Sequence, residues 1–319
     1  MGHVRFVTRW AAPILASGLF LGSACAAPAA YVPNEGSGTV SVIDTSTDRV
    51  TATLQIGTKP RGIAIAGDGA RLYVSDQPSG SLIVYDVRSR SEVGRVQVGK
   101  SPEAVYLSPD GKLASVAVEE NDQVALVDTA TMKVRASVAM KGKNPEHAVF
   151  SPDGKWLYVS AEEADSVDIV EVATARVVKS LTVGERPRGI GFLPDGSRAY
   201  VAAEHADTVA VIDVGRQEVI ARVKAGSRSN GVAVHPDGKH VFISNGGAGT
   251  VQVLDTATNA MIVEVAVGKR PWNMALTPDG AKLYVACGRS DAVSVIDTAT
   301  YTILGEVPVG KLPWGVVIR

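Results

Sequence analysis

YVPNEGSGTVSVIDTSTDRV, residues 31–50, returns almost unchanged near the other end of the chain as YVACGRSDAVSVIDTATYTI, residues 284–303. Five weaker copies lie between these two stretches, and each follows the last after 42 residues, or after 43 in one case. The copies begin at Tyr31, Tyr73, Ser115, Tyr158, Tyr200, Phe242 and Tyr284. A fixed period of this length indicates a repeat architecture, in which one unit cannot bury its own apolar face.

Each copy contains four short runs in which apolar and polar residues alternate. In the first copy they are residues 31–34, 39–44, 50–57 and 61–66, and their β-branched content predicts strands rather than helices. Turn chemistry separates the runs. A Pro-Asp-Gly turn precedes most copies, and an Asp-Thr pair usually follows the second run. We interpret the recurring acids as turn caps and not as catalytic groups; they are Asp44, Asp86, Asp128, Asp213, Asp255 and Asp297.

Four antiparallel strands in each of seven copies, without a helix signal, predict an all-β fold, a seven-bladed β-propeller. The chain ends on PWGVVIR, residues 313–319, which matches PRGIAIA at residues 60–66. We therefore expect the C-terminal strand to complete the blade that Tyr31 begins, which closes the ring and leaves no sheet edge unpaired. The predicted propeller spans residues 31–319, and residues 27–30 form a short segment before it.

The first 26 residues have the features of a cleaved secretory signal peptide. Arg5 and Arg9 precede a short apolar run at residues 11–24, and Ala24-Cys25-Ala26 resembles a small-residue cleavage site. The run is too short for a membrane span, so we expect the protein to be exported to the periplasm. We also expect it to be a monomer. Gly22 stands where a lipobox requires a large aliphatic residue, which argues against a lipid anchor at Cys25.

The charge and the cysteines of the mature chain exclude further classes. Without Arg5 and Arg9 the chain has 30 basic and 33 acidic residues, a net charge of −3. This balance argues against nucleic-acid binding, which normally goes with a basic excess. Cleavage also leaves Cys287 as a single thiol, so no disulfide can form within the chain.

Three features resemble the YVTN-type propeller repeat over residues 31–319. They are the repeated strand that opens each copy, the run TVSVIDT at residues 39–45, and the pattern VGxxPxGIAxxPDG. With KPRGIAI at residues 59–65, the layout is similar to exported propeller proteins associated with pyrroloquinoline-quinone-dependent alcohol catabolism. Those proteins accompany quinone dehydrogenases and an ABC transporter. The resemblance implies a protein partner of that kind. It does not imply the dehydrogenase itself, which has eight blades with tryptophan docking motifs.

Catalytic motifs are missing from the sequence. It contains no C-x-x-C-H for covalent haem, no G-x-S-x-G, no Walker sequence and no H-E-x-x-H. Function must then be sought where the copies differ, because a single ligand rarely has sevenfold symmetry. The position directly after the loop proline varies most, and we expect it to line the mouth of the central channel; it holds Arg61, Glu103, Glu146, Arg188, Asn230, Trp272 and Trp314.

Two candidate sites follow from this rim. The first would hold a small planar anion, such as pyrroloquinoline quinone, by ring stacking and charge-assisted hydrogen bonds; its residues are Arg61, Arg270, Trp272, Trp314, Arg188 and Asn230. The alternative for the tryptophans is that they plug the channel or meet a protein partner. We also expect the rim to divide into an acidic side and a side that carries the tryptophans and arginines.

The second candidate site would bind a divalent metal through carboxylate and imidazole groups; its residues are Glu103, Glu146, His147, Glu162 and His205. His147 stands where other copies have glycine, close to the one extra residue of the repeat near Lys141. The alternatives are that His147 packs beside Phe150 or reaches solvent, and that the acids form a solvated rim. His235 and His240 lie near a turn of the opposite face and are interpreted as surface residues.

The sequence predicts a non-catalytic binding or scaffold propeller, accessory to quinone-dependent oxidation or to a transport system. The alternative is a lactonase-like or metal-dependent enzyme that uses acids and histidine at the rim. Fold alone does not decide between them, because function depends on the site.

Overall fold

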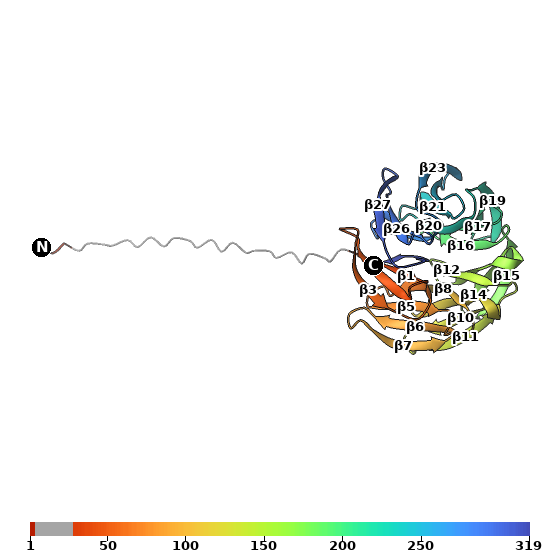
Figure 1. The fold of residues 1–319 in the computed structure, drawn as a ribbon, viewed down its shortest axis with the longest axis horizontal. Helices are drawn as coiled ribbons and strands as arrows, with labels where there is room; N and C mark the ends of the chain where they lie inside the picture. The colour runs from red at the N-terminus through yellow and green to blue at the C-terminus, as the bar shows by residue number, and fades with distance from the viewer. Residues whose placement is uncertain (4–27) are drawn as a thin grey trace.

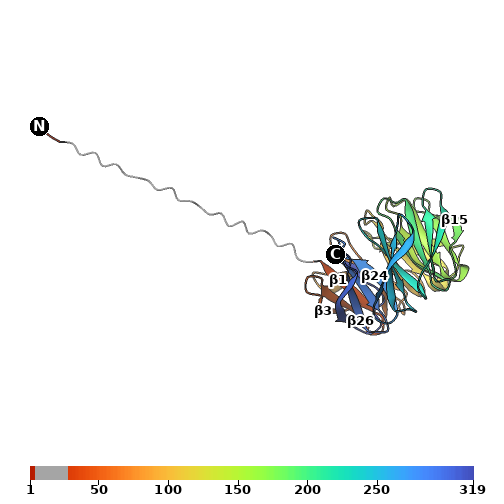
Figure 2. The same cartoon turned by 90° about the horizontal axis from the view of Figure 1, so that it is seen from above.

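The computed structural model describes residues 1–3 and 28–319, and within them it forms a ring of seven four-stranded antiparallel sheets. The colours of Figure 1 run once around this ring and bring the last blade beside the first, and Figure 2 shows the blades from above. Two single-turn 3-10 helices, η1 (Glu119–Asn121) and η2 (Glu162–Ala164), are its only helical elements in the described residues. The predicted seven-bladed propeller is confirmed.

The strands fall into four concentric sets. The innermost strands are β28 (Val317–Ile318), β4 (Pro60–Ile65), β8 (Pro102–Leu107), β12 (Pro145–Phe150), β16 (Pro187–Phe192), β20 (Ser229–Val234) and β24 (Pro271–Leu276). The second strands are β1 (Ala29–Asn34), β5 (Arg71–Asp76), β9 (Leu113–Val118), β13 (Trp156–Ala161), β17 (Arg198–Ala203), β21 (His240–Asn245) and β25 (Lys282–Cys287). The third strands are β2 (Thr39–Asp44), β6 (Ser81–Asp86), β10 (Gln123–Asp128), β14 (Ser166–Glu171), β18 (Thr208–Asp213), β22 (Thr250–Asp255) and β26 (Ala292–Asp297). The outer strands are β3 (Arg49–Gln55), β7 (Ser91–Gln97), β11 (Lys133–Ala139), β15 (Arg176–Thr182), β19 (Glu218–Lys224), β23 (Ala260–Ala266) and β27 (Thr302–Pro308).

Blade 1 is built from both ends of the chain, in the order β28-β1-β2-β3, and blades 2 to 7 follow in sequence. Tyr31 pairs with Val317, and Asn34 forms an isolated bridge with Pro313. Figure 1 shows the C-terminus beside β1. This is the closure that the sequence predicts, although β1 begins at Ala29, two residues before the predicted boundary of the propeller.

The core consists of seven apolar clusters, one between each pair of neighbouring blades. The cluster between blades 1 and 2, for example, joins Tyr31 and Val40 to Leu72 and Ile83. Each blade therefore buries its two faces only against its neighbours, as the repeat period predicts. The free energy of folding depends on a complete ring.

The turns confirm the predicted capping role of the recurring acids. Asp128 accepts hydrogen bonds from the backbone N–H and the hydroxyl of Thr131, and these bonds lower the pKa of its carboxyl group. Thr129 beside it donates its hydroxyl to the carbonyl of Gly111 in the Pro-Asp-Gly turn. The two turns of one blade are thus tied together by side chains that are committed to structure.

A β-bulge interrupts each of the six complete innermost strands directly after its first residue. In blade 2, Pro60 pairs with Asp76 and Ile63 with Val74, so Arg61 and Gly62 together oppose a single residue. Bulges of this kind re-aim a side chain away from the regular ladder. The variable position after the proline sits at this bulge.

Several predictions concern the ends of the chain and the thiol. The signal peptide and Cys25 lie outside the described residues. Cys287 is a free thiol and is fully buried in the cluster between blades 6 and 7. Nowhere in the described residues does a helix reach the length and apolar character that a membrane crossing needs.

Candidate functional site at the channel mouth

The side chains at the variable position meet at one mouth of the channel, although they come from different blades. Arg61 of blade 2 places its Nε 2.6 Å from Oε2 of Glu103 in blade 3 and its Nη2 3.6 Å from Oε1 of Glu146 in blade 4. The closer contact does not have the alignment of a hydrogen bond, so it is an ion pair. Glu103 and Glu146 are at most 2% exposed, whereas about a fifth of the Arg61 side chain remains accessible.

Arg188 of blade 5 is the centre of this group. Its Nη1 lies 2.6 Å from Oε1 of Glu146 and also contacts Glu162, and its Nε donates a 2.9 Å hydrogen bond to Glu204. Three carboxylates therefore surround one guanidinium that is 8% exposed. A buried charge is tolerated when it is paired in this way, and an unpaired one is not.

Two more arginines extend the group towards solvent. Arg186 contacts Glu162 at 3.0 Å, and Arg270 of blade 7 reaches Glu204 with its Nη2 at 2.8 Å. Four arginines thus balance four glutamates; we call these eight residues, Arg61, Glu103, Glu146, Glu162, Arg186, Arg188, Glu204 and Arg270, the mouth network.

Burial and charge set the protonation of the network. The nearby guanidinium groups of Arg188 and Arg61 outweigh the opposing effect of burial and lower the pKa of Glu146 to about 2. Burial, followed by the negative charge of Glu146, raises the pKa of Glu162 to about 8 and raises the pKa of Glu103 well above its usual value. The carboxylate of Glu146 is the one that the arginines hold ionised most firmly.

An aromatic stack lies beside the network. The ring of Trp314 from blade 1 stacks on His147 from blade 4, with centroids 5.7 Å apart and an interplanar angle of 16°. Tyr106 forms a 2.7 Å hydrogen bond through its hydroxyl with Nδ1 of His147, and the Arg61 guanidinium lies 5.4 Å from the Trp314 centroid. Trp314 is 6% exposed and His147 is 1% exposed.

His147 is therefore a packed residue and not a solvent-exposed base. Burial, reinforced by the charges of Arg188 and Arg61, lowers the pKa of its imidazole to about 4 despite the adjacent Glu146. Its Nε2 is buried and has no hydrogen-bond partner. A neutral imidazole suits this position, because a charged ring would add a cation to a place that already holds two guanidinium groups.

The two predicted site sets are interwoven, which differs from the predicted division of the rim into an acidic and a basic side. Arg61, Arg188 and Arg270 of the anion set are paired with glutamates of the acidic set and its neighbours. The two tryptophans also differ from each other. Trp272 lies beside Gly288 of its own blade, next to the Arg270 guanidinium at 5.9 Å, and stays partly exposed.

The predicted metal residues do not form a set of converging ligand atoms in residues 28–319. Glu103, Glu146 and Glu162 face guanidinium groups, and His147 faces Tyr106 and Trp314. Glu162, Arg186 and the exposed His205 line a rim pocket of about 510 Å³. The other residues that line this pocket are Glu119, Asn144, Glu163, Asp165 and Glu185. Metal binding by the five predicted residues stays a hypothesis.

Sequence reasoning missed Tyr106 as a part of the stack. One signal was available, since Tyr106 occupies a position where other copies have Ala64, Gly191, Ala233 or Ala275. Asn230, predicted for the anion site, is buried at 4% exposure, and the structure gives it no ionic contact among the residues described. Trp314 is buried in the stack, whereas Trp272 stays partly exposed, and whether the tryptophans plug the channel or meet a partner stays a prediction.

Three solved structures are similar over nearly their whole length. Hydrazine synthase of Kuenenia stuttgartiensis has 25% identity and a TM-score of 0.78, and the match covers 89% of this chain and 99% of that one. A Bacteroides fragilis protein provisionally named a 6-phosphogluconolactonase has 19% identity and a TM-score of 0.79, over 93% and 99%. A similarly named Bacteroides uniformis protein has 18% identity and a TM-score of 0.78, over 92% and 100%. The latter two show the fold alone.

Comparison with family models adds evidence from the sequence itself. Residues 23–138 match the model described as "Lactonase, 7-bladed beta-propeller", which is about a third of the chain. No protein with a curated description matches this sequence. The model described as a YNCE-like beta-propeller matches residues 82–260, more than half of the 319 residues. With seven blades, a C-terminal closing strand and this match, the chain belongs to the YNCE-like beta-propeller family.

Proposed function

We propose that this propeller is a non-catalytic binding or scaffold protein that recognises its partner at the rim of the channel mouth. The observation that carries the proposal is the mouth network. The acids and arginines that could serve a hydrolase at this place are engaged with one another, and His147 beside them is buried. A general base must come within hydrogen-bond reach of the proton it removes, and a buried, stacked imidazole does not do so.

Direct assays test the absence of catalysis. The purified chain is incubated with 6-phosphogluconolactone and with simple aliphatic lactones, with and without added Zn²⁺. We expect ring opening at the uncatalysed rate in each case. Turnover that Arg188→Met or Glu146→Gln abolishes, while a circular dichroism spectrum shows an intact fold, would contradict the proposal.

The partly exposed Trp272 with Arg270 is the surface on which we expect the partner to bind. A partly exposed indole beside a guanidinium offers a stacking surface and a cation, whereas the corresponding faces of Trp314 are occupied by His147 and Arg61. The candidates are a periplasmic dehydrogenase or transporter component, or a planar anion such as pyrroloquinoline quinone. The first follows from the resemblance to exported accessory propellers, and the second from the chemistry of the pair.

Fluorescence titration separates these candidates. Saturable quenching by the quinone that is lost in Trp272→Phe and kept in Trp156→Phe supports the small anion, because Trp156 lies at the opposite face beside a Pro-Asp-Gly turn. Linear, non-saturable quenching in all variants would exclude the quinone as the ligand. Pull-down with purified candidate proteins then tests the protein partner, with Trp272→Ala as the variant that should lose it.

A lactonase-like enzyme is the second candidate. The lactonase family model over residues 23–138 favours it, as does the rim pocket of about 510 Å³ that Glu162, Arg186 and His205 line. In that case the acidic pocket, and not the closed stack, would hold the substrate. Lactone turnover that His205→Ala reduces and Trp272→Phe leaves unchanged would select this candidate over the scaffold.

A further inference from the structure

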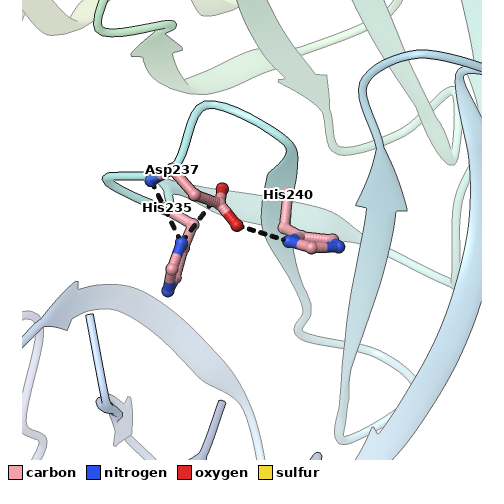
Figure 3. Close-up of side chains that lie close together, drawn as sticks. All are labelled: His235, Asp237 and His240. Carbon is pink, nitrogen blue, oxygen red and sulfur yellow. Dashed lines mark hydrogen bonds and ion pairs between the residues drawn. The ribbon is translucent and has the colours of Figure 1, made fainter. Parts of the chain in front are cut away.

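A second cluster of ionisable side chains lies on the opposite face, at the hairpin between β20 and β21 of blade 6. His235, Asp237 and His240 each offer one ligand atom, and these atoms all lie within 4.8 Å of one another. Figure 3 shows the two imidazole rings on either side of the Asp237 carboxylate. Among residues 1–3 and 28–319, no other group of three or more histidine, cysteine, aspartate or glutamate side chains meets that spacing.

The carboxylate bridges the two rings with a separate oxygen for each. Nδ1 of His235 lies 3.0 Å from Oδ1 of Asp237, and Nδ1 of His240 lies 3.0 Å from Oδ2. All three side chains are between 20% and 31% exposed, so the cluster is sheltered yet open to solvent. The sequence-based interpretation of His235 and His240 as surface residues does not include their contacts with Asp237.

The tautomer of His235 follows from its other contacts. Its Nε2 lies 3.2 Å from the carbonyl oxygen of Gly280 in blade 7, and a carbonyl can only accept, so Nε2 carries the hydrogen. The backbone N–H of Asp237 points at Nδ1 from 3.2 Å, which also places a lone pair on that atom. Metal-binding imidazoles are commonly held in this way, with the second nitrogen donating to a carbonyl.

A neutral His235 then has its Nδ1 lone pair met only by the Asp237 N–H at 3.2 Å, while a carboxylate oxygen lies 3.0 Å from the same nitrogen, and a cation bound there would replace the N–H contact and remove this repulsion. Either a second proton or a metal ion can supply that positive charge. The same holds for the place between Asp237 and His240 when His240 has its lone pair on Nδ1. The geometry therefore contains a gap for one shared cation, lined by two nitrogens and one carboxylate.

The hairpin does not need these histidines in order to fold. In blades 3, 4 and 7 a hydroxyl stands at the position of His235 and donates to the turn aspartate, as Ser108 does to Asp110 and Thr277 to Asp279. The position of His240 holds Arg198 in blade 5 and Lys282 in blade 7. Blade 6 alone combines two imidazoles around the turn aspartate.

We propose that His235, Asp237 and His240 form a binding site for a first-row divalent metal, with Zn²⁺ as the best match. Imidazole with carboxylate is a ligand set that suits zinc, and three protein ligands leave a fourth position for water or for a partner's side chain. Zinc ligand distances of about 2.0–2.2 Å place neighbouring tetrahedral ligands roughly 3.4 Å apart. Small rotations of the two rings would bring the present spacing to that value.

The experiment uses untagged full-length protein, metal-stripped and then titrated with ZnCl₂ by isothermal calorimetry, with stoichiometry checked by elemental analysis. The test variants copy residues that other blades carry at these positions, His235→Ser after Ser108 and His240→Lys after Lys282, so that the hairpin keeps its fold. We expect one zinc ion per chain, bound at least tenfold more weakly in either variant and unchanged in the Asp153→Asn control, which alters the equivalent turn aspartate of blade 4. MgCl₂ should not bind, because Mg²⁺ prefers oxygen ligands.

Two outcomes would overturn the proposal. The first is that wild type and the double variant bind zinc equally, which places the ion elsewhere. The second is that the wild type binds no zinc at 100-fold molar excess while its His235 ring gives the ¹⁵N shifts of a doubly protonated imidazole at pH 7. In that case the gap holds a proton, and the cluster is an ion pair. Melting curves of all variants confirm that they remain folded.

Discussion

Glycine 231 shows how closely the innermost strands approach each other. A Cβ at this position would clash with the carbonyl oxygen of Trp272 in the next blade, and one at Gly62 would meet the carbonyl of Glu103 in the same way. A small residue after the variable position is therefore a steric requirement at Gly62 and Gly231, whereas blade 4 carries His147 and blade 7 carries Asn273 at the same place.

Gly231→Ala should lower the free energy of unfolding by about 1–3 kcal/mol, the usual range for overpacking a tight site. Gly67→Ala is the matched control, because nothing lies within 4 Å of the added methyl group, and it should change stability by no more than about 0.5 kcal/mol. Urea denaturation followed by tryptophan fluorescence measures both. Equal effects in the two variants would show that the strands separate easily.

His147 gives the protein a stability term that depends on pH. Its pKa is lowered from 6.5 to about 4 in the folded state, so the unfolded chain binds this proton first as the pH falls. The contribution is complete above pH 6.5, is lost between about pH 6.5 and 4, and amounts to roughly 3 kcal/mol. Glu162 acts with the opposite sign, since its raised pKa makes its contribution fade as the pH rises towards 8.

The test therefore compares wild type with His147→Gln at each pH. We expect the difference in unfolding free energy between them to shrink as the pH falls from 7 to 4, and His205→Gln to parallel the wild type. Imidazole ¹H and ¹⁵N shifts should place the titration of His147 near pH 4. A titration midpoint above 6 would contradict the structure.

At the scale of the strand, β-bulges affect both edges of a blade: the outer edge, where another strand could add, and the inner edge, where side chains face the channel. Every outer strand carries one, and in blade 6 Ile262 is the extra residue, 47% exposed. A bulge twists the edge and hinders another strand from adding to it. The inner bulges serve the site instead, because they turn Arg61 and its equivalents towards the channel.

The closing strand β28 pairs only two residues with β1, yet it completes a blade and brings Trp314 to the centre. Deleting residues 312–319 should cause insoluble expression or a fall in melting temperature of more than 10 °C, because two sheet edges open and the cluster between blades 7 and 1 loses Val316. Arg319→Ala, which keeps every backbone hydrogen bond, should melt like the wild type. Scanning calorimetry of both proteins checks this.

At the scale of the whole molecule, the mouth network links blades 2, 3, 4, 5 and 7 without using a strand. Arg188→Met removes the cation that three buried carboxylates share and should cost about 3–5 kcal/mol. Arg186→Met, at the exposed edge of the network, should cost less than about 1 kcal/mol. Chemical denaturation at pH 7 measures the pair, and adding Glu146→Gln to Arg188→Met should recover part of the loss.

The sequence predicts the ring better than it predicts the site, and the reason is physical. Alternating β-branched residues and Pro-Asp-Gly turns act locally, so seven copies in register specify seven blades. The contact of Trp314 with His147 joins blades 1 and 4 across the channel, and no local pattern encodes a distance between such positions. The sequence singles out the variable position, but the pairing of its arginines with its glutamates depends on the geometry of the ring.

The aromatic stack also has a consequence for the order of folding events. Trp314 and His147 are 167 residues apart in the sequence, so their contact forms only after blades 1 and 4 have taken their places in one ring. Contacts between such distant positions are slow to form, because the intervening chain must be ordered before they stabilise it. Until the ring closes, His147 and Glu146 stand open to water. Closure of the ring and burial of its charged centre are therefore a single late event.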